Sequence, residues 1–548
     1  MPVREALAAA LPDVSLESKH TPSPAEIFLD TLERETPILS EHIASTPIVS
    51  PSADPLLAYI ATPPPPQLAL PAFTELPSFE SLSPFLCTVI QNARKIPAGS
   101  PMSWKPAVLS RWKIELTRLS ALFNTALAEP TEMNIFRAVL NFVCAPGVVL
   151  SPSFAERRAT NAVGGLDTSV NAALSKVLKG QENKAMKLLC SNGVAKVTPA
   201  VVDALKELHP RRDEELKLPS TSSPQLVVDA NDILKKLFQS ATDFNKSKDV
   251  YGWAPWLFFP VRGEKDGFLS SFSRFACLLA NKPILFPFIC ATLLSGGALT
   301  PLHKLPEEER QQREEAGLPP KLRPINSGSL LAKTVLGAVL ETPAAERAAE
   351  RTAPFQLSLG TKRGVEKLIH ICRAAYGNKW IVGRNDFANG FNSLDRQQML
   401  DTHAQIFPEG TDIFNFFYGI TSPVFLFDDD NNVILLDSAQ GSRQGCTAGT
   451  HAFCIAIHPV VTRLQELYPE YSIRILTDDI IPLMPPPLTN TYEDWQATYL
   501  RYANFLKDLK ELSFSLAGLS LNATGEYAFT SRGPSAQPRS ESCFPRWI

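Results

Sequence analysis

Apolar side chains recur at three- and four-residue steps in residues 81–225, which is the spacing of one face of an α-helix. Between residues 104 and 127, for example, the repeat includes Trp112 and Leu116. A second helical stretch, residues 170–189, also carries four lysines. Those lysines are either a solvated helix face or a stripe that faces phosphates. The pattern predicts a mainly helical N-terminal region.

Shorter apolar runs bounded by turn residues predict strands further along the chain. Residues 296–304 and 321–325 are two such runs, and the charged segment 306–315 between them is typical of a solvated helical insertion. If the two strands pair as a hairpin, Lys304 and Arg323 come close together. An ammonium and a forked guanidinium in one place could clamp a triphosphate.

A carboxylate follows the apolar run that begins at Trp380. Asp386 precedes a turn of small residues, and a helical pattern follows over residues 394–407. Backbone N–H groups in such a turn can bind phosphate without side chains. Phe391, in the same turn, is either a core residue or a ring that stacks beneath a sugar and clashes with a ribose 2′-hydroxyl.

Two adjacent carboxylates, Asp478 and Asp479, stand between two short apolar runs, which again predicts a hairpin. Together with Asp386 they would give three carboxylates at strand ends. Such a set could hold two divalent cations, an arrangement that suits phosphoryl transfer. The richer acidic cluster Asp428–Asp430 also lies between apolar strands, but Asp and Asn are the residues that a tight turn needs, so a plain hairpin is predicted there.

Gln444 and Gly445 end a loop before an amphipathic helical pattern over residues 449–468. A glycine lets the backbone approach a ligand closely, and a glutamine amide both donates and accepts hydrogen bonds. Three side chains nearby raise zinc binding as an alternative, but no fourth ligand follows at a suitable spacing, so we interpret them as core residues. They are Cys446, His451 and Cys454.

Composition limits the alternatives. With 548 residues the chain is too long for one compact core, and its net charge of −3 argues against a basic coat for nucleic acid while allowing a local basic channel. Nine scattered cysteines without a CxxC pair predict free thiols. No signal peptide or long apolar run is visible, so we expect an intracellular protein, in the nucleus or cytoplasm and not in a membrane. The Pro-rich residues 1–80 are expected to be disordered.

In their order along the chain, these motifs resemble the reverse transcriptase domain of retroelements, particularly the non-LTR (LINE-like) group. The segment that begins at Asp386 is similar to the family's first catalytic motif, and the Gln444–Gly445 segment matches the next motif in every diagnostic slot. The sequence from Leu476 to Asp479 resembles the aromatic-x-Asp-Asp motif, with leucine in the aromatic position. The upstream segments around Lys304 and Arg323 resemble the two fingers motifs. The resemblance covers about residues 226–529.

The resemblance implies an α+β fold, with right-hand polymerase fingers over residues 226–370 and an antiparallel palm sheet flanked by helices over residues 371–530. It implies an RNA-directed DNA polymerase that copies an RNA template by adding dNTPs to a DNA primer, with two Mg²⁺ ions, or Mn²⁺, as cofactors. Asp386, Asp478 and Asp479 would be catalytic and would bind the metals. The implied substrate-binding residues are Lys304, Arg323, Phe387, Phe391, Gln444 and Gly445.

Departures from the family pattern leave other interpretations open. Gly525 stands where the family usually has a lysine, and the tail 531–548 resembles no thumb, so the resemblance also implies a truncated copy with impaired activity. One alternative is a domesticated remnant that binds nucleic acid or protein without catalysis. Another is an RNA-dependent RNA polymerase, although those enzymes tend to carry an Asp in the slot that Phe391 occupies. The template, the primer and the oligomeric state stay open.

Overall fold

The computed structural model describes residues 70–71, 73–96, 104–150, 191–220, 225–239, 248–262, 267–489, 491–522 and 527–529. These residues all belong to the compact unit Pro63–Ile548. Some features named above lie outside the described residues: most of segment 1–80, the lysine-bearing stretch 170–189, Gly525 and the tail 531–548.

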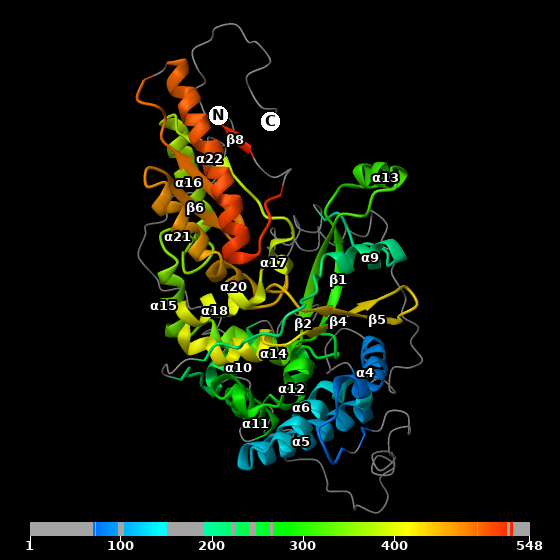
Figure 1. Cartoon of the computed structure of the whole chain (residues 1–548). Coiled ribbons are helices and arrows are strands. Elements are labelled where there is room, and N and C mark those ends of the chain that lie inside the picture. The colour runs from blue at the N-terminus through cyan, green and yellow to red at the C-terminus, as the bar shows by residue number, and fades with distance from the viewer. Residues whose placement is uncertain are drawn as a thin grey trace, which may run out of the picture. The chain divides into compact units, whose positions relative to one another are not determined.

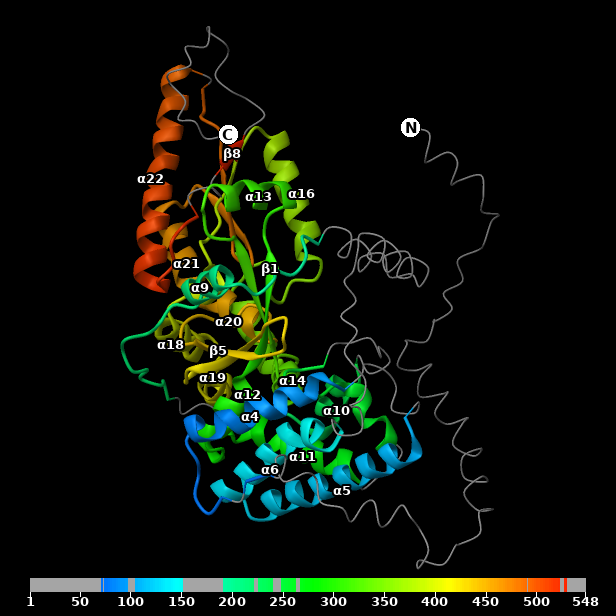
Figure 2. The same ribbon diagram turned by 90° about the vertical axis from the view of Figure 1, so that its right-hand side faces the viewer.

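The described chain begins with three helices, α4 (Phe79–Arg94), α5 (Pro106–Ala128) and α6 (Glu132–Ala145). Helix α5 confirms the predicted helix, because the apolar residues at three- and four-residue steps, such as Trp112, are fully buried. α5 packs against both α6 and α11 (Phe268–Asn281), as the lower part of Figure 2 shows. The N-terminal helices therefore share one hydrophobic core with later helices of the chain.

Helix α6 continues into the π-helical turn η3 (Pro146–Leu150). Together they give a helix, Glu132–Leu150, that is long and apolar enough to cross a membrane by length and composition. However, 72% of its most apolar window is buried inside the protein, and Phe142 stacks on Trp253 with the ring centroids 4.3 Å apart. Its apolar surface is therefore explained by packing in the core. No other helix in the described ranges passes the same test.

The first sheet contains four strands in the order β2-β1-β4-β5. The strands β1 (Gly297–His303) and β2 (Leu322–Gly328) pair antiparallel, as predicted, with Leu302 opposite Arg323. The segment between them holds α13 (Glu307–Glu315), which buries none of its side chains and projects from the hairpin in Figure 1. This result confirms the predicted solvated insertion.

The strands β4 (Ser422–Phe427) and β5 (Val433–Ser438) form the predicted plain hairpin, and β4 runs parallel to β1. Helix α9 (Pro199–Glu207) buries Val201 and Leu205 in a small apolar cluster with side chains of β1, β2, β4 and β5. Residues upstream of the first motif are thus part of the layer that supports this sheet.

The second sheet has the strand order β6-β7-β3-β8. Its strands are β6 (Ser472–Leu476), β7 (Asp479–Met484), β3 (Ile381–Arg384) and β8 (Tyr527–Phe529). β6 and β7 form the predicted antiparallel hairpin, and β3 pairs with both β7 and β8. Two segments that are far apart in sequence, those carrying Asp386 and the Asp478–Asp479 pair, therefore meet in one sheet.

Alternating side chains bury both faces of the second sheet. On one face, Val382 and Leu483 pack against α16 (Gly364–Gly377). On the other face, Ile381 and Met484 belong to the large core that includes α20 (Gly449–Ala456), α21 (His458–Leu467) and α22 (Tyr492–Ala517). The sheet is therefore a buried layer that exposes its catalytic candidates only at its end.

The pattern over residues 449–468 is not one helix but two, α20 (Gly449–Ala456) and α21 (His458–Leu467). The physical reason is visible in the sequence, because Pro459 cannot donate the backbone hydrogen bond that a continuous helix requires. Leu467, at the end of the pattern, is 37% exposed and not a core residue.

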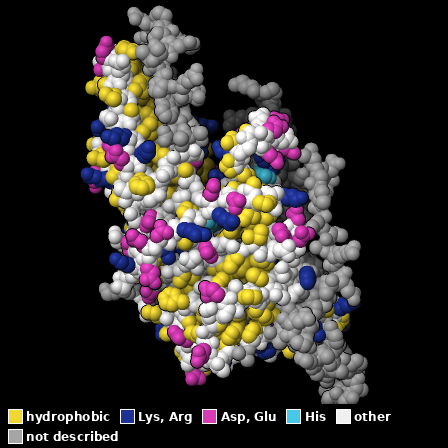
Figure 3. Space-filling model, turned by 45° about the vertical axis from the view of Figure 1, so that its right-hand side comes forward, with side chains coloured by type: hydrophobic (Ala, Val, Ile, Leu, Met, Phe, Trp, Pro, Cys, Tyr) yellow, Lys and Arg dark blue, Asp and Glu magenta, His cyan; other side chains and the backbone are white. Residues whose placement is uncertain are grey.

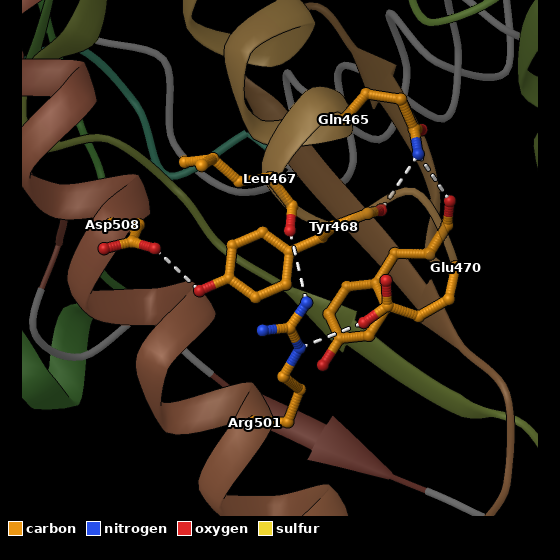
Figure 4. Close-up of polar contacts among 7 residues, drawn as sticks. Gln465, Leu467, Tyr468, Glu470, Arg501 and Asp508 are labelled. Atoms are coloured by element: carbon orange, nitrogen blue, oxygen red, sulfur yellow. Dashed lines mark hydrogen bonds and ion pairs between the residues drawn. The ribbon is translucent and has the colours of Figure 1, made fainter.

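A polar cluster attaches α22 to the end of α21 (Figure 4). The Tyr468 hydroxyl donates to Asp508 at 2.7 Å, and the Arg501 guanidinium lies 4.4 Å from the centroid of the Tyr468 ring. Arg501 also pairs with Glu470, with Nε 3.0 Å from Oε1. Gln465 donates to the carbonyls of residues 468 and 471. These contacts fix the start of β6 against the long helix.

The remaining helices connect these layers. They are α10 (Ala230–Phe238), η5 (Pro255–Val261), η6 (Pro283–Leu285), α12 (Phe288–Ser295), α14 (Leu330–Val339), α15 (Pro343–Arg351), α17 (Gly390–Ser393), α18 (Arg396–Ile406), η7 (Pro408–Gly410) and α19 (Thr411–Tyr418). Helix α18 confirms the helix predicted over residues 394–407. The described chain is of the α+β class, with a helical region and two small sheets.

Candidate active site

Asp386 lies just beyond β3, where the chain leaves the second sheet. The backbones of Asn385 and Ile480 exchange two hydrogen bonds of 2.9 Å, so the sheet fixes the residue that precedes the acid. The Asp386 carbonyl accepts from the Asn522 N–H at 2.8 Å, and its carboxylate accepts from the Asn522 side chain at 3.4 Å. The role of Asn522 was missed from the sequence, because it depends on a contact with a segment far away in the chain.

Asp478 lies in the turn between β6 and β7, where Leu476 pairs with Asp479. Burial raises the pKa of Asp478, and the neighbouring carboxylates of Asp386 and Asp479 raise it further. Asp386 and Asp478 are therefore close enough to repel each other. The structure brings these two predicted acids together.

Asp479 is engaged by a cation. The Nε atom of Arg384, at the end of β3, lies 2.8 Å from Oδ1 of Asp479. The sequence resemblance implies that Asp479 shares in metal binding, but its carboxylate is here shared with an arginine. We did not single out Arg384 from the sequence, because an arginine at a strand end has no distinctive spacing.

The metal site fits the described residues only in part. No group of three or more His, Cys, Asp or Glu side chains able to hold a metal ion occurs in the part of the chain that the structure describes. Asp386 and Asp478 do offer the carboxylate oxygens that Mg²⁺ prefers. A divalent cation would also relieve the repulsion that raises the pKa of Asp478. Metal binding by Asp386 and Asp478 therefore stays a prediction, and the Asp479 carboxylate is paired with Arg384.

Lys304 extends the first hairpin, because its backbone N–H donates to the Lys321 carbonyl at 3.0 Å. Partial burial lowers the pKa of Lys304, the Arg323 cation lowers it further, and the carboxylates of Asp386 and Asp478 oppose this effect. The structure thus confirms that Lys304 and Arg323 are neighbours. It also places Lys304 within electrostatic reach of acids from the other sheet. Binding of a triphosphate by this pair stays a prediction.

The two phenylalanines after Asp386, Phe387 and Phe391, differ in how deeply their side chains are buried. Phe391 is half-buried and stacks on Phe453 with the ring centroids 4.9 Å apart. Phe387 is only 4% exposed and meets the same Phe453 ring edge-on. The Phe387 side chain therefore lies in the core, and substrate binding by Phe387 stays a prediction. For Phe391 both the core interpretation and the sugar-contact interpretation stay open.

The Gly441–Gly445 loop runs along the backbone of the Phe391 turn. The Ser442 N–H donates to the Phe391 carbonyl at 2.7 Å, and the Gly441 N–H donates to the Leu394 carbonyl at 2.9 Å. Gly441 has a φ of 69°, and a Cβ there would lie 2.1 Å from the Phe391 carbonyl oxygen. Only glycine can bring the two segments this close.

Gln444 and Gly445 are held against β2. The Asn326 N–H donates to the Gln444 carbonyl at 2.7 Å, and a Cβ on Gly445 would lie 2.7 Å from the Asn326 carbonyl oxygen. The close backbone approach predicted for Gly445 is therefore real, but its partner is a strand of the protein. The buried Asn392 side chain also accepts from the Gln444 N–H at 3.5 Å. Contact of Gln444 with a nucleotide stays a prediction.

A buried arginine, Arg396, binds the backbone of the Gly441–Gly445 loop and of the residues before it. Arg396 is fully buried and donates to the carbonyls of Gly441, Gln440, Ser438 and Ile420. Burial lowers the pKa of Arg396. These backbone acceptors satisfy the buried guanidinium, which therefore stabilises the loop. Its role was missed from the sequence, since arginine is usually a surface residue.

The three residues that raised zinc binding do not form a metal site. His451 and Cys454 are buried on α20, and burial lowers the pKa of His451 to about 4 and raises the pKa of Cys454 to about 12. Cys446 accepts a hydrogen bond from the Tyr418 hydroxyl at 3.1 Å. The core interpretation is confirmed for His451 and Cys454.

One face of the described surface has mixed charge. On the face drawn in Figure 3, Lys and Arg side chains are interspersed with Asp and Glu side chains. A broad basic coat is therefore not seen in that view, in agreement with the net charge of −3.

Comparison with known proteins gives a local match. No protein-family model matches the chain. The chain is similar to the "Retrotransposable element SLACS 132 kDa protein" of Trypanosoma brucei gambiense, with 24% identity over 175 residues. The match covers 30% of this chain and 14% of that protein, so the chain spans only a small part of its relative.

The chain has a weak structural similarity to two solved structures of Candida tropicalis apo telomerase. One covers 44% of this chain and 45% of that chain, with 11% identity and a TM-score of 0.30. The other, truncated from its C-terminal domain, covers 82% of this chain and 91% of that chain, with 12% identity and the same TM-score of 0.30. Scores this low carry no argument about fold or function.

Proposed function

We propose that this protein is an RNA-directed DNA polymerase that adds dNTPs to the 3′-hydroxyl of a primer. The observation that carries the proposal is that the paired backbones of residues 385 and 480 bring Asp386 and the Asp478–Asp479 turn to one end of the second sheet. The charges of Asp386 and Asp478 also act on Lys304, which follows the first strand of the other sheet. Two facing acids suit divalent cations and a neighbouring cation suits phosphate, which are the needs of nucleotidyl transfer. The local similarity to a retrotransposon protein supports the same reaction class.

In this proposal the second sheet with α20, α21 and α22 is the palm, and the β1–β2 hairpin belongs to the fingers. The antiparallel order β6-β7-β3 supports the palm assignment, because it brings two acidic turns to one end of a buried sheet. The hairpin then faces the acids with its basic side chains. This geometry is what a phosphate group between the two sheets requires.

Asp386 and Asp478 would hold two Mg²⁺ ions, for which Mn²⁺ could substitute, with Asp479 beside them in its ion pair with Arg384. Bound cations would acidify the primer 3′-hydroxyl and neutralise charge on the departing pyrophosphate. The protein's own task is to place these carboxylates. It does so through the paired backbones of residues 385 and 480 and through the tight β6–β7 turn.

Lys304 and Arg323 would bind the incoming triphosphate, the first as a point charge and the second through forked hydrogen bonds. The half-exposed ring of Phe391 would exclude a ribose 2′-hydroxyl, and Gln444 with Gly445 would line the nascent base pair. The RNA template and the DNA primer would be held mainly through their backbones, since a polymerase must accept every sequence.

One observation favours a second function, binding of nucleic acid without catalysis. Arg384 engages Asp479, and no three-ligand metal group is found in the described residues. A decayed site in which an arginine replaces a metal contact would have this appearance. A polymerase needs the carboxylates of Asp386 and Asp478 for catalysis. A protein that only binds nucleic acid does not.

Primer extension on an RNA template separates these functions. The wild-type protein, supplied with Mg²⁺ or Mn²⁺, should incorporate dNTPs, and Asp478→Asn should abolish incorporation without weakening template binding. Template binding without extension by the wild type would support the second function. Equal use of rNTPs and dNTPs would contradict the role assigned to Phe391.

A further inference from the structure

Gln356, which is not among the proposed catalytic residues, reaches the turn that carries Asp478. Its side chain is 2% exposed. The Gln356 amide oxygen accepts from the Thr477 N–H at 3.1 Å, and its nitrogen donates to the Thr477 carbonyl at 3.4 Å. One buried amide therefore holds both backbone polar groups of the residue next to the catalytic acid.

The segment around Gln356 is itself attached to β6. The Leu357 N–H donates to the Ile475 carbonyl and the Ile475 N–H donates to the Phe355 carbonyl, both at 2.9 Å. The amide oxygen of Gln356 also accepts from the Ser358 N–H at 3.0 Å, which fixes its orientation. A second link joins the hydroxyls of Ser358 and Thr477 at 2.8 Å. The amide is thus presented by a segment that an isolated β-bridge to Ile475 holds against β6, and not by a free loop.

Thr477 needs such support because its backbone is in an unfavourable conformation. Its φ is 63°, in the left-handed region, where a β-branched residue is a rare exception. Conformations of this kind persist only when surrounding contacts impose them. Gln356 and Ser358 make such contacts with Thr477.

We propose that Gln356 is a positioning residue that holds Thr477 in the left-handed conformation and thereby places the Asp478 carboxylate opposite Asp386. The inference rests on the proposed polymerase function for its kinetic consequence, but the structural part stands on the contacts alone. Without the amide, Thr477 relaxes toward an ordinary conformation and the carboxylate moves with the turn.

The first test is a double-mutant cycle with primer-extension kinetics. Gln356→Ala should lower kcat by about 10- to 100-fold, the cost of a small misplacement of a reacting group, while KM for dNTP stays constant. In a Thr477→Asn background the loss should be smaller, because asparagine adopts the left-handed conformation readily. Equal losses in both backgrounds would overturn the proposal. If the alanine variant does not fold, Gln356→Met, which is uncharged and of nearly the same size, removes both hydrogen bonds to Thr477 without leaving a large cavity.

A matched control is Gln465→Ala. Gln465 also binds strand β6 through its amide, but at the other end, with contacts to residues 468, 471 and 473 (Figure 4). This variant should lower stability and leave kcat nearly unchanged. A loss of kcat equal to that of Gln356→Ala would show that any loosening of β6 has the same effect and would refute a specific positioning role.

Hydrogen exchange of residues 475–480 gives a readout that does not require activity. Gln356→Ala should accelerate exchange of this segment at least about 10-fold, because the Thr477 N–H loses its acceptor. Gln465→Ala should not accelerate it, and unchanged exchange in Gln356→Ala would overturn the proposal. If the wild type fails to extend a primer, the proposed polymerase function fails, and the exchange result still decides the role of Gln356.

Discussion

Two turns rich in aspartate join antiparallel strands in this protein, and their surroundings differ. In the turn after β4, the Asp428 carboxylate accepts from the N–H and the side-chain amide of Asn432 at 2.7 and 2.9 Å, and these hydrogen bonds lower the pKa of Asp428. In the turn after β6, burial and the facing carboxylates raise the pKa of Asp478. The first turn uses its acid for its own folding, and the second presents its acid to other residues.

The same contrast appears in the backbone. Each turn contains one non-glycine residue in the left-handed region, Asn431 with a φ of 66° and Thr477 with a φ of 63°. Asparagine adopts this conformation readily and threonine does not. The number of acids therefore does not distinguish the two turns as candidates for a catalytic role. A turn whose residues oppose its conformation, and which is held by contacts from elsewhere, is the better candidate.

Exchanging the acids for amides should give the largest difference between the turns. We expect Asp478→Asn to slow primer extension by at least about 100-fold, the scale on which loss of one electrostatic stabiliser slows an enzyme. Asp428→Asn should leave the rate unchanged. Rates on an RNA template with saturating dNTPs measure both, and an equal loss in the two variants would remove the distinction.

Exchanging the left-handed residues should change stability in opposite directions. Thr477→Asn should stabilise the protein and Asn431→Thr should destabilise it, each by about 1 kcal/mol, because the left-handed conformation costs an L-residue roughly that much. Loss of the Ser358–Thr477 hydroxyl contact will offset part of the first gain. Urea unfolding measures both changes, and destabilisation by Thr477→Asn would contradict the strain assigned to that turn.

The dependence of stability on pH should have opposite signs in the two turns. The folded-state pKa of Asp478 is raised, so its contribution to stability is present below the ordinary pKa of aspartate and is lost as the pH rises through the folded value. The pKa of Asp428 is lowered, so its contribution is present above that ordinary pKa and is lost as the pH falls. At neutral pH, Asp478→Asn should therefore raise Tm and Asp428→Asn should lower it slightly. Shifts of the same sign would refute this account.

Removal of the cation beside each turn should have the smallest effect. Arg384→Gln removes a charge that lowers the pKa of Asp478, so the acid limb of the pH–rate profile should move to higher pH. Lys196→Gln is the matched control, because Lys196 lies 3.4 Å from Asp429 in the other turn. Its profile should coincide with that of the wild type. An unmoved limb in Arg384→Gln would exclude an electrostatic role for this ion pair.

Local patterns predicted much of the site. Asp386 and Asp478 could be placed because short alternating runs end at each acid, and the Lys304–Arg323 hairpin followed from the same rule. Gln356 and Arg396 could not be placed in this way. Their roles come from contacts between segments far apart in sequence, and nothing near them in the chain signals a buried amide or a buried cation.

The Leu208 carbonyl, just beyond α9, accepts from the side chains of Asn389 and Asn392 at 2.9 and 3.2 Å. Further on, the Lys217 backbone exchanges two hydrogen bonds of 2.8 Å with the Gln397 amide. These contacts matter for anyone who prepares a recombinant fragment. A fragment that begins at residue 226, where the family resemblance begins, lacks the Leu208 carbonyl. Asn389 and Asn392, which follow Asp386 in the chain, then lose their hydrogen-bond acceptor. A fragment that begins at or before residue 191 retains the Leu208 carbonyl. We therefore expect the fragment that begins at residue 226 to be the less active of the two.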